Sequence, residues 1–249
     1  MARRRLSDTS HPDASLDETY WLKFGNQPQP AMRDKIIILT SEEVAAVGPT
    51  EFNVSSVSDR LGITHPMVNH YFGGRDHLIA ETAFFVYRRY ITALWEAVLT
   101  APADPRERLR RWINEQIVRT RELGGWGGIL NYPSSTKAIS DIIESNYGQQ
   151  MQELFANNIV RLGSLVQDIR SGTVTDWQTV DSEELSQRLL SEKNDPDSVL
   201  SVGASIAWST LGISVWSAGQ HLPSSNIPRL LEVKEEIMAA HIERIIDSI

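Results

Sequence analysis

Apolar residues recur at the spacing of an α-helix along most of the chain, and no segment alternates between apolar and polar positions as a half-buried strand would. From Met32 to Val47, apolar residues occupy positions 36, 39, 44 and 47, which predicts a helix with one inward face. Gly48 and Pro49 follow and are expected to end it. The pattern therefore predicts an all-α protein.

Two short helices are predicted next, starting at residues 54 and 65. Asn53 is suited to cap the first of these helices, and Gly62 is expected to stop it. Thr64 is suited to cap the second helix. Two short helices joined by a turn of about three residues that contains glycine form a helix-turn-helix. The small core that holds them is predicted to consist of Ile36, Val44, Val57, Leu61, Ile63, Val68 and Phe72.

Longer helices are predicted in the rest of the chain, over residues 76–99, 106–123, 136–169, 198–220 and 230–249. Within the third of these, Tyr147 and Gly148 mark a candidate break. Residues 124–135 form a Gly-rich, aromatic loop, and residues 171–197 form a polar segment. Because residues 198–220 are apolar nearly all round, they predict a buried helix.

The composition is that of a globular protein and argues against disulfide-rich, secreted and membrane-spanning proteins. The chain has 249 residues, 41% of them hydrophobic, which suits one large globular domain or two small ones. It contains no cysteine, so disulfides and thiolate metal sites are excluded, and this absence suits a reducing compartment. The N-terminal arginines lack the apolar run of a secretory signal, and no membrane-spanning run is present. A cytoplasmic protein is expected.

The segment from Ile36 to Ile79 resembles the DNA-binding domain of the TetR/AcrR family of transcriptional regulators. The resemblance rests on the first helix ending in Gly48, on the run from Leu61 to Thr64, and on the junction Tyr71-Phe72-Gly-Gly-Arg75-Asp76-x-Leu78. It covers about 45 residues. Asn69, Tyr71, Arg75 and Ser58 replace residues that are frequent in the family, so no operator sequence can be transferred.

The resemblance implies an N-terminal three-helix helix-turn-helix domain followed by a larger helical domain for ligand binding and dimerisation. The expected division is a flexible N-terminal arm over residues 1–30, the DNA-binding domain over 31–78, and the larger domain over 79–249. The expected partners are a double-stranded DNA operator, a small-molecule effector and a second copy of the chain, without a membrane. Two recognition helices reading successive major grooves require a dimer.

The outward side chains of the third helix are candidates for contacts with bases and phosphates. Positive charge in this part is weak, because residues 31–75 hold four basic residues against five acids. The arginines of the arm would compensate if they reached the minor groove, and the alternative is a tail that only aids solubility. The candidate DNA-binding residues are Arg3, Arg4, Arg5, Lys35, Ser55, Thr64, His65, Pro66, Asn69, His70, Tyr71 and Arg75.

Aromatic residues beyond the DNA-binding part are candidates either for the helical core or for an apolar pocket. An apolar pocket with few polar groups suits a hydrophobic or amphipathic small molecule. The candidate ligand-binding residues are Trp112, Trp126, Tyr132, Tyr147, Met151, Phe155 and Trp208. In the last two helices, small residues such as Gly203 and Gly212 and an aliphatic stripe that includes Ile242 and Ile246 suit a four-helix dimer interface or burial within one subunit.

The sequence gives no signature of an enzyme. It contains no P-loop, dinucleotide fingerprint or nucleophile elbow, so no cofactor and no catalytic residue are expected. His65, His70 and His77 straddle a helix break, which argues against a shared metal ion. We therefore predict a ligand-controlled transcriptional regulator, most simply a repressor. Two alternatives stay open: a small-molecule-binding protein or enzyme that keeps the helix-turn-helix only as structure, and a regulator that answers to a protein partner.

Overall fold

The computed structural model describes residues 30–130, 136–177, 187, 195–219 and 235–249. Its regular elements are helices only, which confirms the all-α prediction for this part of the chain. The elements are α2 (Met32–Glu51), α3 (Val54–Leu61), α4 (His65–Phe72), α5 (Arg75–Leu99), α6 (Pro105–Glu122), the 3-10 turn η1 (Gly124–Trp126), α7 (Gly127–Leu130), α8 (Lys137–Ser171), α10 (Val199–Gly219) and α11 (Glu235–Asp247).

The predicted ends of the first helices are confirmed. Gly48 adopts a φ of 82° and interrupts α2, which continues for one short turn from Pro49 to Glu51. Asn53 caps α3, because its side chain accepts a hydrogen bond from the Ser55 backbone N–H at 2.9 Å. Gly62 ends α3 in the left-handed conformation, with φ 63°, which a residue with a Cβ adopts only at a cost.

Buried side chains form two hydrophobic cores. The first core, here called the DNA-side core because the predicted helix-turn-helix packs around it, contains buried residues of α2, α3, α4 and the first part of α5, together with Leu123, Trp126 and Ile139 from later in the chain. Five of the predicted core residues are buried in it, and Leu61 and Ile63 pack against it as half-buried side chains. The second core, here the distal core, lies among α5, α6, α8, α10 and α11.

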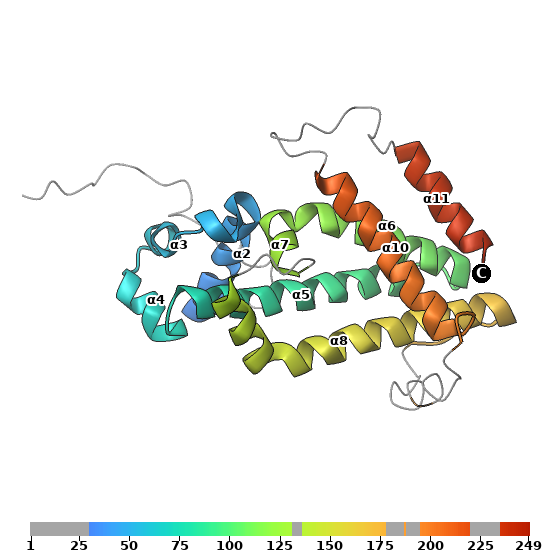
Figure 1. The fold of residues 1–249 in the computed structure, drawn as a ribbon, viewed down its shortest axis with the longest axis horizontal. Coiled ribbons are helices and arrows are strands. Elements are labelled where there is room, and N and C mark those ends of the chain that lie inside the picture. Colours follow the sequence, from blue (N-terminus) through green and yellow to red (C-terminus); the bar gives the residue numbers. More distant parts are fainter. Residues whose placement is uncertain (1–29, 131–135, 178–186, 188–194, 220–234) are drawn as a thin grey trace, which may run out of the picture.

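Two long helices connect these cores (Figure 1). On α5, Leu78 to Ala83 belong to the DNA-side core and Ile91 to Val98 to the distal core. On α8, Ile139 belongs to the DNA-side core and Val160 to Val166 to the distal core. α8 runs without interruption through Tyr147 and Gly148, so the break considered there is absent, although its ribbon bends near its N-terminal end (Figure 1). A shift of either helix would therefore move side chains in both cores.

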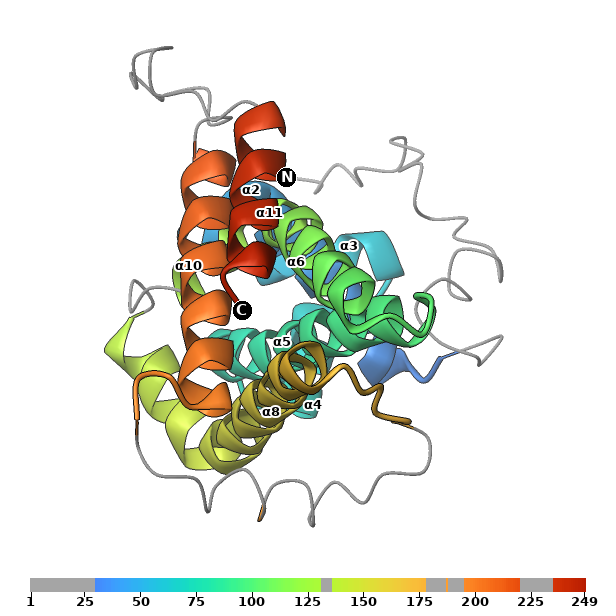
Figure 2. The ribbon, with the colours of Figure 1, turned by 90° about the vertical axis from the view of Figure 1, so that its right-hand side faces the viewer.

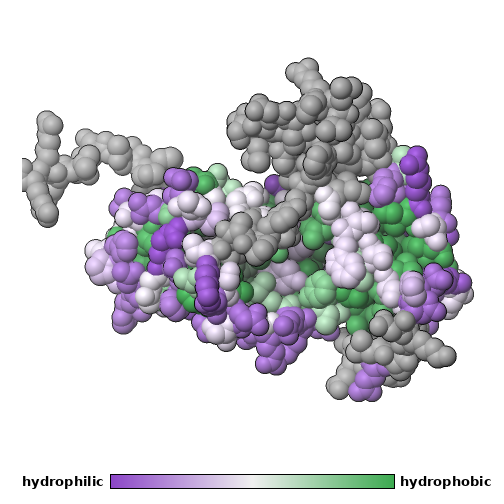
Figure 3. Space-filling view, in the orientation of Figure 1, coloured by the Kyte–Doolittle hydropathy of each residue, from purple (hydrophilic) through white to green (hydrophobic). Residues whose placement is uncertain are grey.

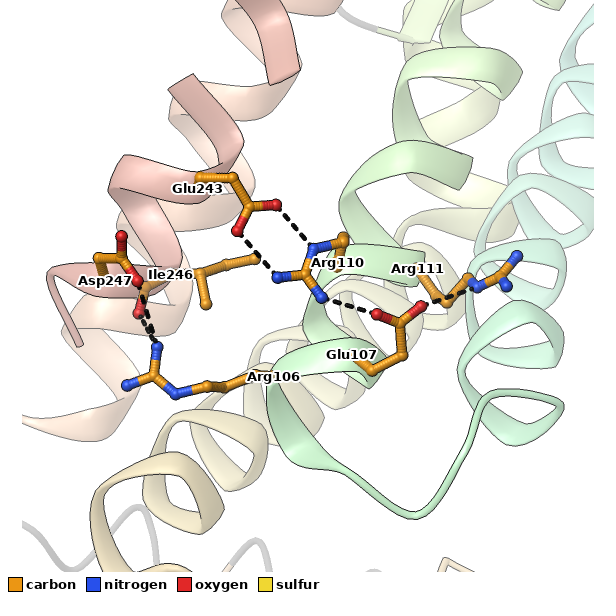
Figure 4. A network of polar contacts seen from close by, with 7 residues as sticks. All are labelled: Arg106, Glu107, Arg110, Arg111, Glu243, Ile246 and Asp247. Carbon is orange, nitrogen blue, oxygen red and sulfur yellow. Dashed lines mark hydrogen bonds and ion pairs between the residues drawn. The ribbon is translucent and has the colours of Figure 1, made fainter. Parts of the chain in front are cut away.

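The C-terminal helix packs on its own subunit. Ile242 and Ile246 of α11 are buried in the distal core, and α11 lies against α6 (Figure 2). At the rim of this contact, Arg110 of α6 donates two hydrogen bonds to the Glu243 carboxylate, at 2.7 and 2.8 Å (Figure 4). Arg106 donates to the Ile246 carbonyl at 3.0 Å. These two isoleucines are therefore buried within the subunit.

The structure corrects one expectation for α10. This helix is apolar in composition, but it is not buried all round, because Ser205, Trp208, Ser209 and Gly212 are exposed along one side. The opposite side packs on α6 and α8. The ends of α5, α6 and α8 and the start of α10 lie within two residues of the predicted ones. The predicted end of the fourth long helix at residue 220 and the predicted start of the last helix at residue 230 fall outside the described residues. No helix among the described residues is long and apolar enough to cross a membrane.

Candidate nucleic-acid interface

The turn between α3 and α4 is fixed by its backbone. The N–H of Gly62 donates to the Asp59 carbonyl at 3.2 Å, and the N–H of Ile63 donates to the Ser58 carbonyl at 3.0 Å. These bonds satisfy carbonyls at the end of α3 that would otherwise lack a helical partner. The chain then leaves the helix in a defined direction, which sets where α4 begins.

α4 is amphipathic, with a narrow inward side. Val68 and Phe72 are 1% and 7% exposed and anchor the helix in the DNA-side core. The residues facing away from that core are Thr64, His65, Pro66, Met67, Asn69 and His70, all exposed, and Tyr71 is half-buried. Figure 3 shows a largely hydrophilic surface at the end of the molecule that α3 and α4 form. The structure therefore brings six of the predicted DNA-binding residues together along one short helix and its N-cap.

Two details of α4 differ from the sequence reasoning. Thr64 occupies the N-cap position, but its side chain makes no capping hydrogen bond; its carbonyl instead accepts from the Met67 N–H at 2.9 Å. Met67 was not among the candidates, and its side chain is exposed on the outward side. Its position could have identified it as an outward residue, because it lies one residue before inward-facing Val68 and three residues after Thr64, on the outward side of the helix. An exposed methionine here offers an apolar contact among polar neighbours.

The arginines of the helix-turn-helix are bonded to protein groups. Arg33 forms an ion pair with Glu81 of α5, with Nη2 to Oε2 at 2.6 Å. Arg60 lies 3.2 Å from Glu42 of α2 and 4.0 Å from Glu43. Positive charge that already faces acids of the same chain adds little to the attraction of a phosphate backbone. The helix-turn-helix therefore presents even less positive charge to a phosphate backbone than its sequence indicates.

Arg75, predicted to contact a phosphate, is directed toward the protein in this structure. Its Nε donates to the Phe52 carbonyl at 3.2 Å, and one terminal nitrogen donates to the Pro49 carbonyl. Another terminal nitrogen lies 3.1 Å from the Asp76 carboxylate. Pro49 lies in the last turn of α2 and Phe52 directly follows that helix, so Arg75 ties the start of α5 to the end of α2. About a third of the side chain, 35%, stays exposed to solvent.

The other predicted DNA-binding residues lie outside α4. Lys35 is half-buried in the first turn of α2, and Ser55 is half-buried in the first turn of α3. Arg3, Arg4 and Arg5 lie outside the described residues.

The predicted ligand-binding residues do not converge on one place in the structure. Trp112 is fully buried in the distal core, whereas Trp126 is buried in the DNA-side core and donates from its indole to the Ser41 carbonyl at 2.8 Å. Tyr147 stacks on Phe84 of α5, with ring centroids 5.1 Å apart.

The other predicted ligand residues differ widely in exposure. Met151 is half-buried, whereas Phe155 and Trp208 are 42% and 62% exposed. Tyr132 lies outside the described residues.

A groove of about 620 Å³ lies where α2 meets α5 and α6. Ser41 and Ala45 of α2 line it, and among the predicted ligand residues that the structure describes, Trp126 alone does so. Its walls combine apolar side chains with charged ones from α5 and α6, among them Arg89 and Arg119. Burial, and then the neighbouring Arg119 charge, lower the pKa of Arg89. A ligand in this groove would touch both parts of the protein.

The chain is similar to curated regulators over part of its length. It is 31% identical over 97 residues to the HTH-type transcriptional regulator BetI 1 of Chromohalobacter salexigens, a match that covers 37% of this chain and 46% of that protein. It is 33% identical over 78 residues to BetI of Burkholderia ambifaria, covering 31% and 40%. The chain thus spans less than half the length of the curated relatives it matches. No model of a known protein family matches it.

Two solved structures share the fold over nearly the whole chain. One is a protein of unknown function from Rhodococcus sp. RHA1, with a TM-score of 0.55 and 13% identity, covering 89% of this chain and 96% of that one. The other is a proposed transcriptional regulator from Pseudomonas aeruginosa PAO1, with a TM-score of 0.52 and 18% identity, covering 87% and 88%. At these identities the likeness concerns the fold, which is an all-helical one.

Proposed function

We propose that this protein is a DNA-binding transcriptional regulator of the TetR/AcrR type. The observation that carries the proposal is the outward side of α4, where exposed polar side chains stand on a short helix held from behind by Val68 and Phe72. A helix of this length depends on packing for its stability, so its outward side chains are not needed to fold it. A helix-turn-helix places such a helix in the major groove. The partial similarity to HTH-type regulators supports the same conclusion.

We further propose that the regulator is a homodimeric repressor, released from its operator by a hydrophobic or amphipathic small molecule. Two copies of α4 would need a separation of about 34–36 Å to enter successive major grooves. A ligand that favours another separation weakens DNA binding by its difference in affinity for the two states. α5 and α8, which run through both cores, are suited to carry such a shift. The groove beside Trp126 supplies one candidate position for the ligand.

The DNA-binding proposal is tested by selecting a preferred sequence from random duplexes with the wild-type protein and measuring the affinity of variants for it. Asn69→Ala and His70→Ala are expected to weaken binding by about 1–3 kcal/mol each where the side chain contacts a base. Asn114→Ala on α6 is the matched control, because Asn114 is also an exposed helical asparagine but lies away from α4. It should leave affinity unchanged.

Two outcomes would contradict the proposal. If the wild-type protein selects no sequence and binds no duplex, the helix-turn-helix serves only as structure. That result would favour the alternative of a small-molecule-binding protein or enzyme. If a sequence is selected but neither α4 variant binds more weakly than the Asn114→Ala control, another surface contacts the DNA. The arginines bonded within the protein are the feature that favours the first alternative.

A further inference from the structure

Four helices meet in one chain of side-chain contacts that ends at the recognition helix. Glu81 of α5 receives two contacts from the Arg33 guanidinium of α2, one of them at 2.6 Å. The same guanidinium lies over the ring of Phe72, with its central carbon 4.9 Å from the ring centroid. Phe72 is the last residue of α4. On the other side of this ion pair, the Glu81 carboxylate lies close enough to Tyr147 of α8 to act on the pKa of its hydroxyl. The order is therefore Tyr147, Glu81, Arg33, Phe72.

The surroundings of Tyr147 place this contact where α8 joins the DNA-binding part. Tyr147 stacks on Phe84, one turn along α5 from Glu81. Two turns earlier on α8, Ile139 is 2% exposed in the DNA-side core, and Ile142 and Ile143 pack against that core. Burial first, and then the charge of the Glu81 carboxylate, raise the pKa of the Tyr147 hydroxyl.

The ion pair between Arg33 and Glu81 is better suited to hold the helices in position than to stabilise the fold. The Arg33 and Glu81 side chains are 45% and 16% exposed, and a partly exposed pair contributes little to the free energy of unfolding. Its geometry is nevertheless specific, because two parallel contacts fix the plane of a guanidinium against a carboxylate. That plane also faces the Phe72 ring, so a displaced Arg33 would leave the C-terminal end of α4 without one of its lateral contacts.

We propose that Arg33, Glu81 and Tyr147 are positioning residues that set the orientation of α4 according to the position of α8. A movement of α8 in the distal core would reach the recognition helix through these contacts, without any of the three residues touching DNA. The inference rests on the proposed function for its biological meaning, since it names the contacts through which α8, like α5, would pass a shift to the DNA-binding helices. The contacts themselves do not depend on that function.

The test uses the full-length protein and three variants, each removing one contact: Tyr147→Phe, Glu81→Gln and Arg33→Met. Affinity is measured on the duplex selected by the wild-type protein, and backbone hydrogen exchange is measured over α4. Each variant is expected to weaken DNA binding by roughly 2- to 30-fold, the range of couplings carried by residues that touch neither ligand. Exchange over α4 should quicken, while the unfolding temperature stays within a degree or two of wild type.

Two controls separate positioning from general damage. Arg33→Lys keeps a cation opposite Glu81 but not the planar fork that makes two parallel contacts, so it should recover only part of the affinity that Arg33→Met loses. Glu115→Gln on α6 breaks an ion pair with Arg119 that has the same 2.6 Å separation but joins two residues of one helix, and it should change nothing over α4.

The proposal is overturned if the three variants leave exchange over α4 at the wild-type rate, or if Glu115→Gln quickens it equally. Exchange is measured without DNA. A protein that binds no duplex would therefore refute the proposed function, but exchange over α4 would still test the positioning contacts. A variant that loses DNA affinity only together with a large fall in unfolding temperature would show that the contact is structural.

Discussion

Arg75 shows how one side chain can satisfy a family-like motif and still play a different part in the fold. In the sequence it stands at the junction where a cation next to a helix N-terminus suggests a phosphate contact. In the structure its guanidinium bridges the carbonyls of Pro49 and Phe52 and lies beside Asp76. The last carbonyls of a helix have no helical N–H four residues on, and α2 ends at Glu51, so the Pro49 carbonyl needs such a donor.

Replacing Arg75 separates these two roles. Arg75→Lys keeps the positive charge but cannot reach two carbonyls with a planar fork, so we expect the free energy of unfolding to fall by about 1–2 kcal/mol in urea denaturation. A phosphate contact predicts something else: Arg75→Gln would reduce the slope of log affinity against log salt by about 0.9. If Arg75→Lys is as stable as wild type, the carbonyl contacts contribute nothing.

At the scale of elements, α8 and α10 cross at two glycines. A Cβ placed on Gly203 of α10 would lie 2.9 Å from the Gly163 backbone nitrogen and 3.1 Å from the Leu162 carbonyl carbon of α8. Small residues in α10 were expected to allow a close approach of helices, and Gly203 does so within one subunit. The close approach lets α10 cover Leu162 and Leu165, which are fully buried.

Gly203→Ala is therefore expected to push α10 away from α8 and to lower the free energy of unfolding by about 1–3 kcal/mol. The matched control is Gly148→Ala on α8, where the added Cβ meets only the flexible Glu144 side chain, at 3.3 Å. That change should be neutral or stabilising by up to about 1 kcal/mol, since alanine favours a helix more than glycine. Equal losses from both substitutions in urea denaturation would refute the close-packing account.

For the whole molecule, the open question is which surface a second copy would cover. Ile242 and Ile246 of α11 are buried within the subunit, and the rim of that contact is held by Arg110 and Glu243. α10 instead leaves Trp208 62% exposed, beside exposed Ser205, Ser209 and Gly212. An exposed tryptophan among small residues is a suitable centre for an interface, because aromatic anchors carry much of the binding energy in interfaces.

We therefore expect Trp208→Ser to weaken self-association by about 30-fold or more, measured by sedimentation equilibrium. Operator affinity should fall with it, since one subunit reads only one half-site. Val118→Ser on α6 is the control, because Val118 is also an exposed hydrophobic residue, at 46%, but lies on another helix. A wild-type protein that stays monomeric at every concentration would exclude the α10 interface.

Local features were readable from the sequence because their causes are local. Asn53 caps α3 through a hydrogen bond two residues away, and Gly62 stops it through a backbone angle that glycine adopts freely. Val68 and Phe72 were placed inside by helical spacing alone. The all-helical class, the two short helices and the outward residues of α4 follow from the same short-range rules.

The remaining features depend on which segments meet, and residue spacing along one helix does not determine that. Only the tertiary structure showed that Arg75 faces carbonyls, that Arg33 joins Glu81 to Phe72, and that Trp112 and Trp126 belong to different cores. Each contact joins residues far apart in the chain. The sequence by itself determined the helices and their apolar faces, because backbone angles and residue spacing are local; the packing of the helices against one another decided the surroundings of Arg75, Arg33 and the two tryptophans, because contacts between distant segments set them.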